Sequence, residues 1–352
     1  MLTKSRRPPM LLLREFRIKN NWTQAELARR AGISRSSVAA IENSALVPSV
    51  HTALALARSL DCTVEELFGN ERSEAIAWAW HPSQDSPSYW EAAFDQKCLA
   101  FPVEPMPYSI LPPDGWFDGH MRKPISMDVS GMTLIMASCD PAAGFLTTMM
   151  GSRTGVRVLS FHRSSNEALS LLKQGVVHVA GTHLREINEP EGNEAVVREQ
   201  LGKGFRLLRG AVWHDGVAVR PGEGLTGLKK VTSAHIRWIG RKPGSGARRC
   251  QDKALQGDRA TRNIAQNHWE VAMAVSQGWV DAGVCHRLTA EQAGLEFLQV
   301  SQEAFDLCYP VHLENDPRIR ALRKVVQSAG YRKCLAGFRG IDTRTSGNEM
   351  LV

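Results

Sequence analysis

The segment TQAELARRAGISRSSVAAIEN, which runs from Thr23 to Asn43, constrains the fold of this chain more than any other stretch. Thr23 followed three residues later by Glu26 is a capping-box signature, which predicts that a helix begins there. Gly32 can adopt the left-handed backbone conformation at low cost. Ser34 is a favourable cap for a second helix. The segment therefore predicts two short helices joined by a tight turn.

The second of these helices carries different side chains on its two sides. Val38 and Ile41 are three residues apart, so they share the buried side. Short polar and basic residues remain at the exposed front of the helix, and such side chains fit into the major groove of DNA. The helix therefore predicts a surface that contacts base edges, made of Arg35, Ser36, Ser37 and Ala40.

Apolar and capping residues on both sides extend this region to a five-helix domain from about Leu11 to Phe68. In its order, spacing and capping residues the domain resembles the Cro/phage-repressor (XRE-like) class of helix-turn-helix DNA-binding domains. The resemblance implies a double-stranded DNA operator as partner, and it adds Gln24, Ser34 and Asn43 to the DNA-binding residues, with Gln24 and Asn43 near phosphates. The alternative is a small helical bundle that binds protein instead of DNA.

The composition is compatible with this interpretation. A chain of 352 residues is long enough for two or three domains, and its net charge of +7 suits a nucleic-acid partner. Seven cysteines without a CxxC pair make a disulfide framework or a zinc ribbon improbable and favour a reducing cytoplasm. The apolar run at 10–13 is too short for a signal peptide, and no later segment is apolar enough to span a bilayer. We expect a cytoplasmic protein without a membrane partner.

Composition and hydrophobic periodicity change along the chain, which predicts three parts. These are a helix-turn-helix head at 1–70, a small β-rich connector at 71–128, and a larger domain at 129–352. The connector is dense in proline and aromatic residues, and 76–80 and 98–103 alternate like short strands. Aromatic side chains need a surface on which to be buried, so we expect packing, with a dimer contact as the alternative.

The larger domain alternates strands and helices, which is typical of a mostly parallel α/β sheet. Its size suggests two lobes, which we expect at 129–205 plus 314–352 and at 206–313. The pattern predicts two strands around a turn at His214-Asp215-Gly216 within 205–219. It also predicts separate strands at 295–300 and 306–313.

Two segments of the larger domain, GVRVLSFHRSSNEALSLLKQGVVHVAG and NHWEVAMAVSQGWVDAGVCH, carry a second resemblance. The domain resembles the periplasmic-binding-protein fold (class II, two-lobed), used inside the cell as an effector domain. It looks closest to the versions found behind helix-turn-helix domains or attached to molybdopterin-synthesis proteins. The resemblance implies a small-molecule effector between the lobes, with molybdate or a related oxyanion as the first candidate.

Ligands of open α/β sheets bind beyond the carboxyl ends of the strands, where helix N-termini present free amides. Strand-to-helix loops with hydroxyls, glycines and basic residues therefore supply the expected ligand site. Its predicted members are Ser138, Cys139, Ser164, Ser165, Thr182, Arg241, Gly244, Ser245, Gly246 and Asp281. Simpler roles remain open for some of them: Ser164 can act only as a helix cap, Arg241 can belong to a solvated basic face, and Asp281 can contact only a hinge amide.

No catalytic motif precedes a suitable helix, so we expect no enzyme, no catalytic residues and no cofactor apart from an anionic effector. His162, His178 and His183 lie close in sequence but have no metal-binding spacing, so no metal site is expected. The combined hypothesis is a ligand-responsive transcription regulator that acts as a homodimer on a two-fold operator. The alternatives are an accessory protein or enzyme of molybdenum-cofactor metabolism, or a DNA-bound partner-binding protein without a small ligand.

Overall fold

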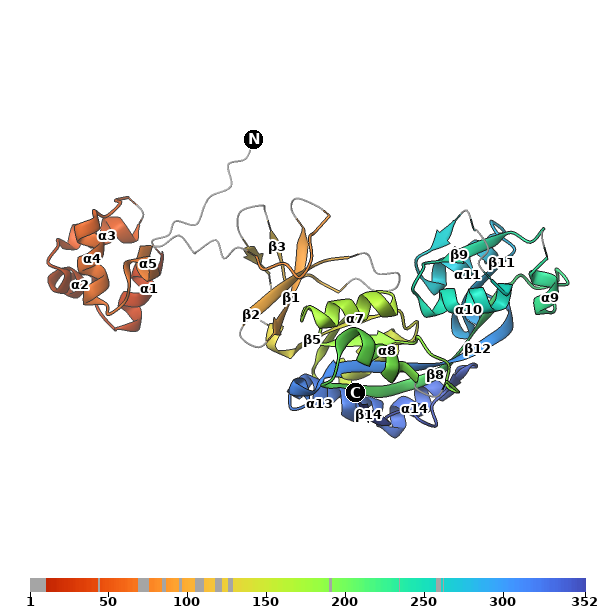
Figure 1. Cartoon of the computed structure of the whole chain (residues 1–352). Coiled ribbons are helices and arrows are strands. Elements are labelled where there is room, and N and C mark those ends of the chain that lie inside the picture. The colour runs from red at the N-terminus through yellow and green to blue at the C-terminus, as the bar shows by residue number, and fades with distance from the viewer. Residues whose placement is uncertain are drawn as a thin grey trace. The chain divides into compact units, whose positions relative to one another are not determined.

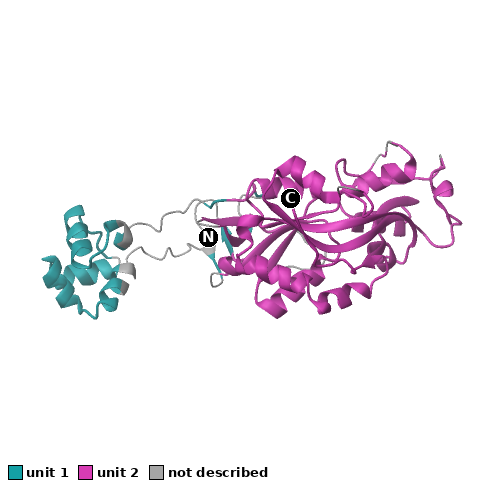
Figure 2. Ribbon diagram, turned by 60° about the horizontal axis from the view of Figure 1, so that its bottom comes forward, with its two compact units in different colours: residues 1–77, 82–88, 115–125 teal, residues 78–81, 89–114, 126–352 magenta. Residues whose placement is uncertain are grey.

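The structure of the chain is a computed structural model, shown in Figure 1. It describes residues 11–43, 45–68, 76–83, 87–94, 97–104, 111–117, 122–125, 129–189, 192–233, 235–257, 261 and 263–352. The chain divides into two compact units, coloured separately in Figure 2. Unit 1 comprises 1–77, 82–88 and 115–125, and unit 2 comprises 78–81, 89–114 and 126–352.

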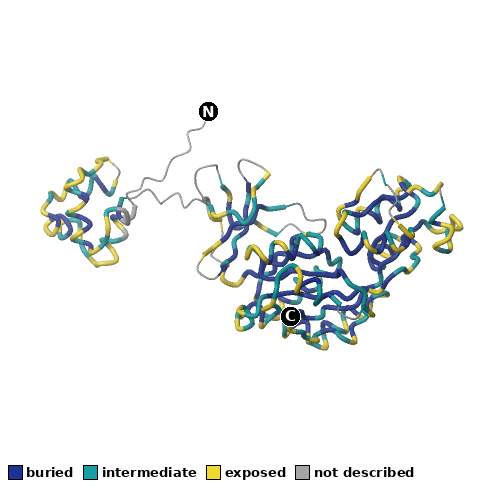
Figure 3. Tube along the Cα trace, viewed as in Figure 1, coloured by how far each residue is buried: buried dark blue, intermediate teal, exposed yellow. Residues whose placement is uncertain are grey.

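Five helices form the N-terminal domain of unit 1, as the sequence predicts. They are α1 (Leu11–Lys19), α2 (Gln24–Ala31), α3 (Arg35–Glu42), α4 (Val50–Ser59) and α5 (Val64–Phe68). Their core contains Leu27, Val38, Ile41 and Leu56, each completely buried. In Figure 3, buried segments in dark blue alternate with exposed segments in yellow along these helices. The predicted inward side of α3 is therefore confirmed.

Local capping explains where α2 and α3 begin and end. Thr23 accepts a hydrogen bond from the backbone amide of Glu26 at 3.1 Å, and Gly32 ends α2 with a φ of 66°. Ser34 caps α3 by accepting from the backbone amide of Ser37 at 3.0 Å. The capping box at Thr23 is only half formed, because the carboxylate of Glu26 pairs with Arg29 and Arg30 instead of reaching back.

The residues between the two large domains are divided between the units. In unit 2, β1 (Ser88–Phe94) and β2 (Lys97–Pro102) form an antiparallel hairpin. In unit 1, β3 (Gly115–Phe117) pairs with β4 (Arg122–Pro124). The compact units divide the range 71–128, while its described strands belong to one four-stranded sheet, so the connector expected there stays a prediction. Burial of its large apolar side chains explains why the hairpin joins the α/β core.

The hairpin contributes directly to that core. Phe101 of β2 stacks on Phe161 with ring centroids 5.6 Å apart, and Trp90 is buried in the same cluster. Asp114 forms an ion pair with Arg157 at 2.6 Å. Trp90, Phe94 and Phe101 are therefore part of the α/β core of unit 2, as expected, whereas Trp116 in unit 1 is exposed.

A mixed sheet organises the rest of unit 2. Its strand order is β10-β9-β11-β8-β12-β7-β5-β6, with β13 and β14 also pairing with β8. The strands are β5 (Thr133–Ser138), β6 (Arg157–His162), β7 (Val179–Thr182), β8 (Phe205–Val219), β9 (Trp238–Arg241), β10 (Ile264–Ala265), β11 (Ala282–His286), β12 (Glu296–Pro310), β13 (Ile341–Asp342) and β14 (Glu349–Leu351).

Helices lie between most of these strands in the chain. They are α6 (Ala143–Thr154), α7 (Ser165–Lys173), α8 (Gly192–Leu201), α9 (Leu228–Val231), α10 (Gly246–Leu255), α11 (His268–Ser276), α12 (Arg287–Gln292), α13 (Pro317–Val326) and α14 (Ala329–Ala336), with 3₁₀ turns at Ser130–Met132 and Val311–Leu313. None of the helices among the described residues has the length and apolar character needed to cross a bilayer.

The two long strands β8 and β12 correct the predicted topology. Each is one continuous strand of 15 residues, and they pair antiparallel with each other. The sheet is therefore mixed, not mostly parallel. The turn expected at 214–216 is absent because these residues pair with both β11 and β12. A β-carbon on Gly216 would lie 2.2 Å from the carbonyl oxygen of Leu298, so this glycine permits close strand approach.

The strands expected at 295–300 and 306–313 are both parts of β12. A register shift between Gln299 and Ser301 marks a bulge in it, and the bulge lets one strand continue where the sequence suggests an interruption. Because β8 and β12 are continuous, the chain crosses between the lobes within strands rather than in loops.

Two lobes share these strands, as Figure 1 shows. The first lobe has its core around β5, β6, β7 and the half of β8 that contains Leu208. The second lobe has its core around β9, β11 and the half of β8 that contains Val217. The expected boundaries at 205/206 and 313/314 fall near the outer ends of β8 and β12, whereas the two cores meet within these strands.

Candidate functional site

The exposed front of α3 carries the residues expected to contact DNA. Ser34, Arg35, Ser36 and Asn43 are exposed, while Ser37 and Ala40 are half-buried. The hydroxyl of Ser34 lies 2.8 Å from that of Ser36 and 2.7 Å from that of Ser37. These serines form a short polar surface at the helix N-terminus, with the Arg35 side chain beside it.

Gln24 is held in place in this structure. Its amide donates to the carboxylate of Glu42 at 2.8 Å, and Arg17 forms an ion pair with the same carboxylate at 2.6 Å. Glu42 thus joins α1 and α2 to α3. A contact between Gln24 and a DNA phosphate would require its amide to leave Glu42.

A second group of polar side chains lies at the boundary between the lobes of unit 2. We call this group the interlobe cluster, and it comprises Cys139, His183, Trp213, Asp215, Arg241, His268, His286 and Glu303. Cys139, His183 and Arg241 follow or end strands β5, β7 and β9, and His286 ends β11. Trp213 and Asp215 lie within β8, Glu303 lies within β12, and His268 begins α11. Eight separate positions in sequence thus converge on one place in the fold.

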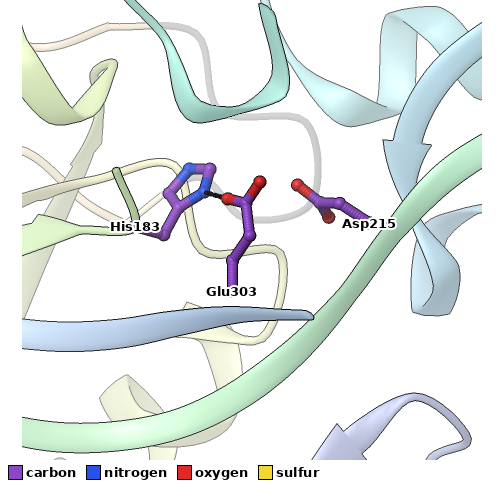
Figure 4. A group of neighbouring side chains, drawn as sticks. All are labelled: His183, Asp215 and Glu303. Carbon is purple, nitrogen blue, oxygen red and sulfur yellow. Dashed lines mark hydrogen bonds and ion pairs between the residues drawn. The ribbon is translucent and has the colours of Figure 1, made fainter. Parts of the chain in front are cut away.

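His183 is the centre of the hydrogen bonding in this cluster. Its Nδ1 lies 2.7 Å from the carboxylate of Glu303, as Figure 4 shows, and its Nε2 lies 2.9 Å from the sulfur of Cys139. Burial opposes the charged imidazolium, but its contacts with Cys139 and Glu303 outweigh burial and raise the pKa of His183 well above its ordinary value. The ring is held in place further because the His183 amide donates to Ser165 at 3.2 Å.

Asp215 is a completely buried carboxylate close to Glu303 (Figure 4). Neither of its oxygens has a hydrogen-bond partner within the described part of the chain. Burial, followed by the charge of Glu303, raises the pKa of Asp215 to about 7. An unsatisfied carboxyl in such a position is unfavourable unless a proton, a cation or a ligand donor satisfies it.

The second lobe supplies hydrogen-bond donors. Nδ1 of His268 accepts from the backbone amide of His286 at 2.9 Å, and Nδ1 of His286 accepts from the amide of Leu288 at 3.0 Å. Burial lowers the pKa of both imidazoles, so both are neutral near pH 7. A neutral imidazole that accepts at Nδ1 carries its proton on Nε2, so each ring presents an N–H donor.

These donors have no partners among the described residues. The Nε2 atoms of both histidines and the Nε atom of Arg241 are buried and unpaired. Further buried, unpaired polar side-chain atoms in the described part of this unit belong to Thr182, Arg206, His214, Asp215, Gln251, Thr289, Tyr309 and Thr345. Because buried polar groups in proteins are nearly always satisfied, the unpaired atoms of Asp215, Arg241, His268 and His286 in one cluster indicate a site that a polar ligand completes.

Direct contacts hold the two lobes together around the cluster. Asn166 of α7 donates to the carbonyl oxygen of Gly244 at 2.7 Å, and Lys242 pairs with Glu167 at 2.5 Å. Two more ion pairs, between Lys253 and Glu186 at 2.6 Å and between Arg249 and Glu189 at 3.1 Å, join α10 to the segment after β7. The structure is therefore that of a closed pair of lobes.

Several of the predicted ligand residues do meet at this boundary. Ser138, Cys139, Ser165 and Thr182 are buried on the side of the first lobe. Arg241 and Gly246 are buried on the side of the second lobe, and a β-carbon on Gly246 would lie 2.2 Å from the carbonyl oxygen of His183.

Other predicted residues have local roles. Ser164 caps α7 in a complete capping box with Glu167, and Ser245 caps α10. Gly244 offers its carbonyl to Asn166, as described above. Asp281 precedes β11, at the end of that strand opposite His286, and forms an ion pair with Arg237 at 2.6 Å. The structure does not bring Asp281 together with the interlobe cluster.

Two residues at the centre of the cluster, Asp215 and Glu303, are not among those that the sequence predicts for the ligand site. His183 follows the strand end Gly181-Thr182, where the sequence does place possible hydrogen-bond donors. Asp215 lies at the predicted turn, and Glu303 lies between two predicted strands. The signal that could have identified them is an acidic residue inside a strand that is otherwise apolar, as in AVWHDGVAV and SQEAFDLCYP.

A separate surface depression of about 450 Å³ lies elsewhere in unit 2. Its lining includes Arg287, Glu291, Phe297 and Arg339, and no member of the interlobe cluster contributes to it. Arg287 and Glu291 satisfy each other at 2.8 Å. The depression therefore lacks the unsatisfied buried groups that distinguish the interlobe cluster.

Comparison with known proteins finds a family match in two regions of the chain. Residues 146–327 match the family described as the PBP superfamily domain, and residues 13–67 match the helix-turn-helix family. The uncharacterized protein YvgK of Bacillus subtilis (strain 168) is 26% identical over 205 residues, which are 54% of this chain and 64% of that protein. The match thus spans less than two thirds of the relative's own length.

The helix-turn-helix domain has relatives of its own. An uncharacterized HTH-type transcriptional regulator of Archaeoglobus fulgidus is 38% identical over 56 residues, covering 16% of this chain and 79% of that protein. Another, MJ0272 of Methanocaldococcus jannaschii, is 34% identical over 62 residues, covering 18% of this chain and 94% of that protein.

Solved structures similar to this chain include two whose titles name an ABC transporter. One is a putative phosphate ABC transporter substrate-binding protein with bound phosphate from Clostridium perfringens, with a TM-score of 0.49 at 9% identity, covering 60% of this chain and 98% of that one. The other is the tungstate ABC transporter from Geobacter sulfurreducens, with a TM-score of 0.44 at 15% identity, covering 58% and 98%. At these TM-scores the similarities do not decide which ligand this chain binds.

Proposed function

Because the chain belongs to the PBP superfamily domain family and carries a helix-turn-helix domain of the HTH-type transcriptional regulators, we propose that it is a ligand-responsive DNA-binding transcription regulator. The helix-turn-helix domain would bind an operator through the exposed front of α3. The two-lobed domain would bind a small polar effector at the interlobe cluster. Effector binding would shift the population between open and closed lobes and so change DNA binding.

The unsatisfied donors of Arg241, His268 and His286 are the observation that supports this proposal most directly. All three are buried at the lobe boundary, and each has a side-chain nitrogen without a partner among the described residues. Forming hydrogen bonds to a ligand there would remove a desolvation cost of about 1–3 kcal/mol for each unsatisfied group. A ligand rich in acceptors is favoured.

For the effector we propose a small anion, with molybdate or a related oxyanion as the first candidate. The guanidinium of Arg241 and the two imidazole N–H groups suit the oxygens of such an ion. The carboxylates of Asp215 and Glu303 oppose a bare dianion, so part of this negative charge has to be neutralised when the anion binds. A small carboxylate is the next candidate on the same reasoning.

A single recognition helix contacts only a few base pairs, so we propose that the protein binds a two-fold operator as a homodimer. Because its target is DNA, we propose that the protein acts in the cytoplasm. We also propose that it binds its effector without chemical change, since its polar side chains are arranged to complete the hydrogen bonds of a ligand.

The experiment that tests this function has two stages. Selection from random DNA with the purified full-length chain first defines an operator. Operator affinity is then measured by fluorescence anisotropy with and without molybdate, tungstate, phosphate, sulfate and small carboxylates. We expect one of these anions to change operator affinity at least about fivefold, which is the lower range of typical allosteric coupling.

Two results would contradict the proposal in different ways. Failure to select any DNA sequence would remove the regulator function itself. Selection of an operator whose affinity no anion changes, together with an unaltered melting temperature in every anion, would remove the effector and favour a partner-binding role. Arg241→Lys serves as the matched variant, because it keeps the charge but loses the unpaired guanidinium Nε.

A further inference from the structure

The carboxylates of Asp215 and Glu303 form a negatively charged group that the anion proposal leaves unsatisfied. Together with His183 they offer one ligand atom each, and these three atoms all lie within 4.8 Å of one another (Figure 4). The three residues come from β8, from β12 and from the segment after β7. Residues far apart in sequence are thus positioned by strands, which hold side chains more rigidly than loops do.

Asp215 is the carboxylate of this group that lacks a hydrogen-bond partner in the described part of the chain. His183 contacts Glu303 at 2.7 Å, and Ser301 donates to Glu303 at 3.3 Å. Asp215 has both oxygens buried without a partner among the described residues. The buried guanidinium of Arg241 attracts Asp215 electrostatically, but its Nε atom forms no hydrogen bond with any described residue. A cation held by both carboxylates would satisfy the oxygens of Asp215 and remove the cost of burying them unpaired.

We infer that His183, Asp215 and Glu303 bind a divalent first-row transition-metal ion such as Zn²⁺ or Mn²⁺. One imidazole nitrogen and two carboxylate oxygens are a donor set that such ions accept. Mg²⁺ and Ca²⁺ fit less well, because they prefer ligand shells made of oxygen alone. Nδ1 of His183 would exchange its proton for the metal, while its Nε2 remains beside Cys139.

The required movement is small. Ligand atoms around a metal with bonds of about 2.0–2.2 Å are separated by roughly 3 Å. The hydrogen-bonded pair of His183 and Glu303 is already at 2.7 Å, and Asp215 has to approach only from within 4.8 Å. Because Asp215 has no hydrogen bond to break among the described residues, rotation of its side chain costs little.

This inference names a component of the effector site and in that respect rests on the proposed function. Three protein ligands leave coordination positions open for water or for an anion. The unpaired donors of Arg241, His268 and His286 belong to the same cluster. A metal ion would neutralise the two carboxylates and allow an oxyanion to bind against those donors.

The test is isothermal titration of tag-free, full-length protein with Zn²⁺ and with Mn²⁺ after dialysis against a chelator. We expect one ion per chain, and at least about tenfold weaker binding in Asp215→Asn and in Glu303→Gln. Glu291→Gln is the matched control, because Glu291 lies on the surface depression and should leave metal binding unchanged. Absorption of bound Co²⁺ provides a second readout of a nitrogen and oxygen donor set.

Folding of the variants can be separated from their metal binding. Without metal, Asp215→Asn should melt at or above the temperature of the unmodified chain, since it removes a buried, unpaired carboxylate. Metal binding that is equal in all four proteins, or that is absent for both ions, would overturn the inference.

The outcomes also separate this inference from the proposed function. Stoichiometric metal binding without any change in operator affinity would retain the metal site and reject it as part of an effector site. A change in operator affinity with an oxyanion in chelator-treated protein, without metal binding, would retain the proposed function and reject the metal.

Discussion

Asn166 donates a hydrogen bond to the carbonyl oxygen of Gly244 at 2.7 Å, and the two residues belong to different lobes of unit 2. Next to this contact, Lys242 pairs with Glu167. Burial acts in the opposite direction, but hydrogen bonds from Lys242 and Ser164 lower the pKa of Glu167 to about 2. The closed lobes are thus held by polar contacts at their rim.

Weakening this rim should shift the lobes towards the open state. We expect Lys242→Met to lower effector affinity by up to about fivefold, because a half-exposed ion pair contributes roughly 0.2–1 kcal/mol. The effect should shrink in high salt, which screens the pair in the unmodified protein. Effector affinity measured by calorimetry at low and high salt checks this, and equal affinities at low salt would contradict it.

Gly246→Ala should prevent close contact between the lobes. The added β-carbon would lie 2.2 Å from the carbonyl oxygen of His183 and 2.6 Å from its Nδ1. We expect both lobes still to fold and small-angle scattering to show a larger radius of gyration. Effector affinity should fall at least about tenfold, which corresponds to a loss of ~1.4 kcal/mol of binding free energy. Gly151→Ala in α6 is the control, since nothing lies within 4 Å of its β-carbon.

Arg35→Ala should weaken operator binding without destabilising the domain. Arg35 is exposed at the start of α3, so its truncation leaves the core intact. Loss of a base contact costs about 1–3 kcal/mol, or about 5–150-fold in affinity. Anisotropy with the selected operator measures the loss. Lys19→Ala at the end of α1 should have a smaller effect, and an equal effect would assign Arg35 to general electrostatics.

The buried contact of Asp114 should stabilise unit 2. Its carboxylate accepts from Arg157 at 2.6 and 2.7 Å and from the backbone amide of Glu91 at 2.8 Å. We expect Asp114→Ala to lower the free energy of unfolding by about 3 kcal/mol, because the Arg157 guanidinium then keeps only its neutral partners, Thr133 and the carbonyl oxygen of Glu91, and loses its counter-charge. The double variant Asp114→Ala, Arg157→Met should recover part of this loss in urea unfolding. If the single and the double variant lost the same free energy of unfolding, the result would be inconsistent with a stabilising Asp114–Arg157 pair.

Stability should fall in acid because of His178. Burial, followed by the charge of Arg318, lowers the pKa of His178 to about 3, while Asp316 acts in the opposite direction. In the unfolded chain this pKa is about 6.5. The unfolded state therefore binds a proton that the folded state does not. The contribution of His178 is complete above pH 6.5 and decreases as the pH falls from 6.5 towards 3, by about 1.4 kcal/mol per pH unit.

Urea unfolding at several pH values between 7 and 4 checks this prediction. Other buried histidines add to the total slope, so the informative quantity is the difference from His178→Gln. The variant should show a slope that is smaller by one proton. If the free energy of unfolding had the same slope against pH in both proteins, His178 would take up its proton equally in the folded and unfolded states.

Local sequence signals determined the helix-turn-helix domain. Ser34 caps α3, Gly32 provides the left-handed turn, and Val38 and Ile41 repeat at helical spacing. Each of these effects acts within a few residues, so it can be recognised without knowledge of the rest of the chain. The family of the C-terminal domain was also predictable, through strand-helix alternation and the resemblance of two segments.

Tertiary structure alone decided the long strands and the centre of the site. The turn signal at Asp215-Gly216 was overridden because pairing with both β11 and β12 satisfies the backbone there. His183 and Glu303 lie 120 residues apart in sequence and meet only because β7 and β12 are neighbours in the sheet. Contacts over such separations depend on strand order and register, which no local pattern encodes.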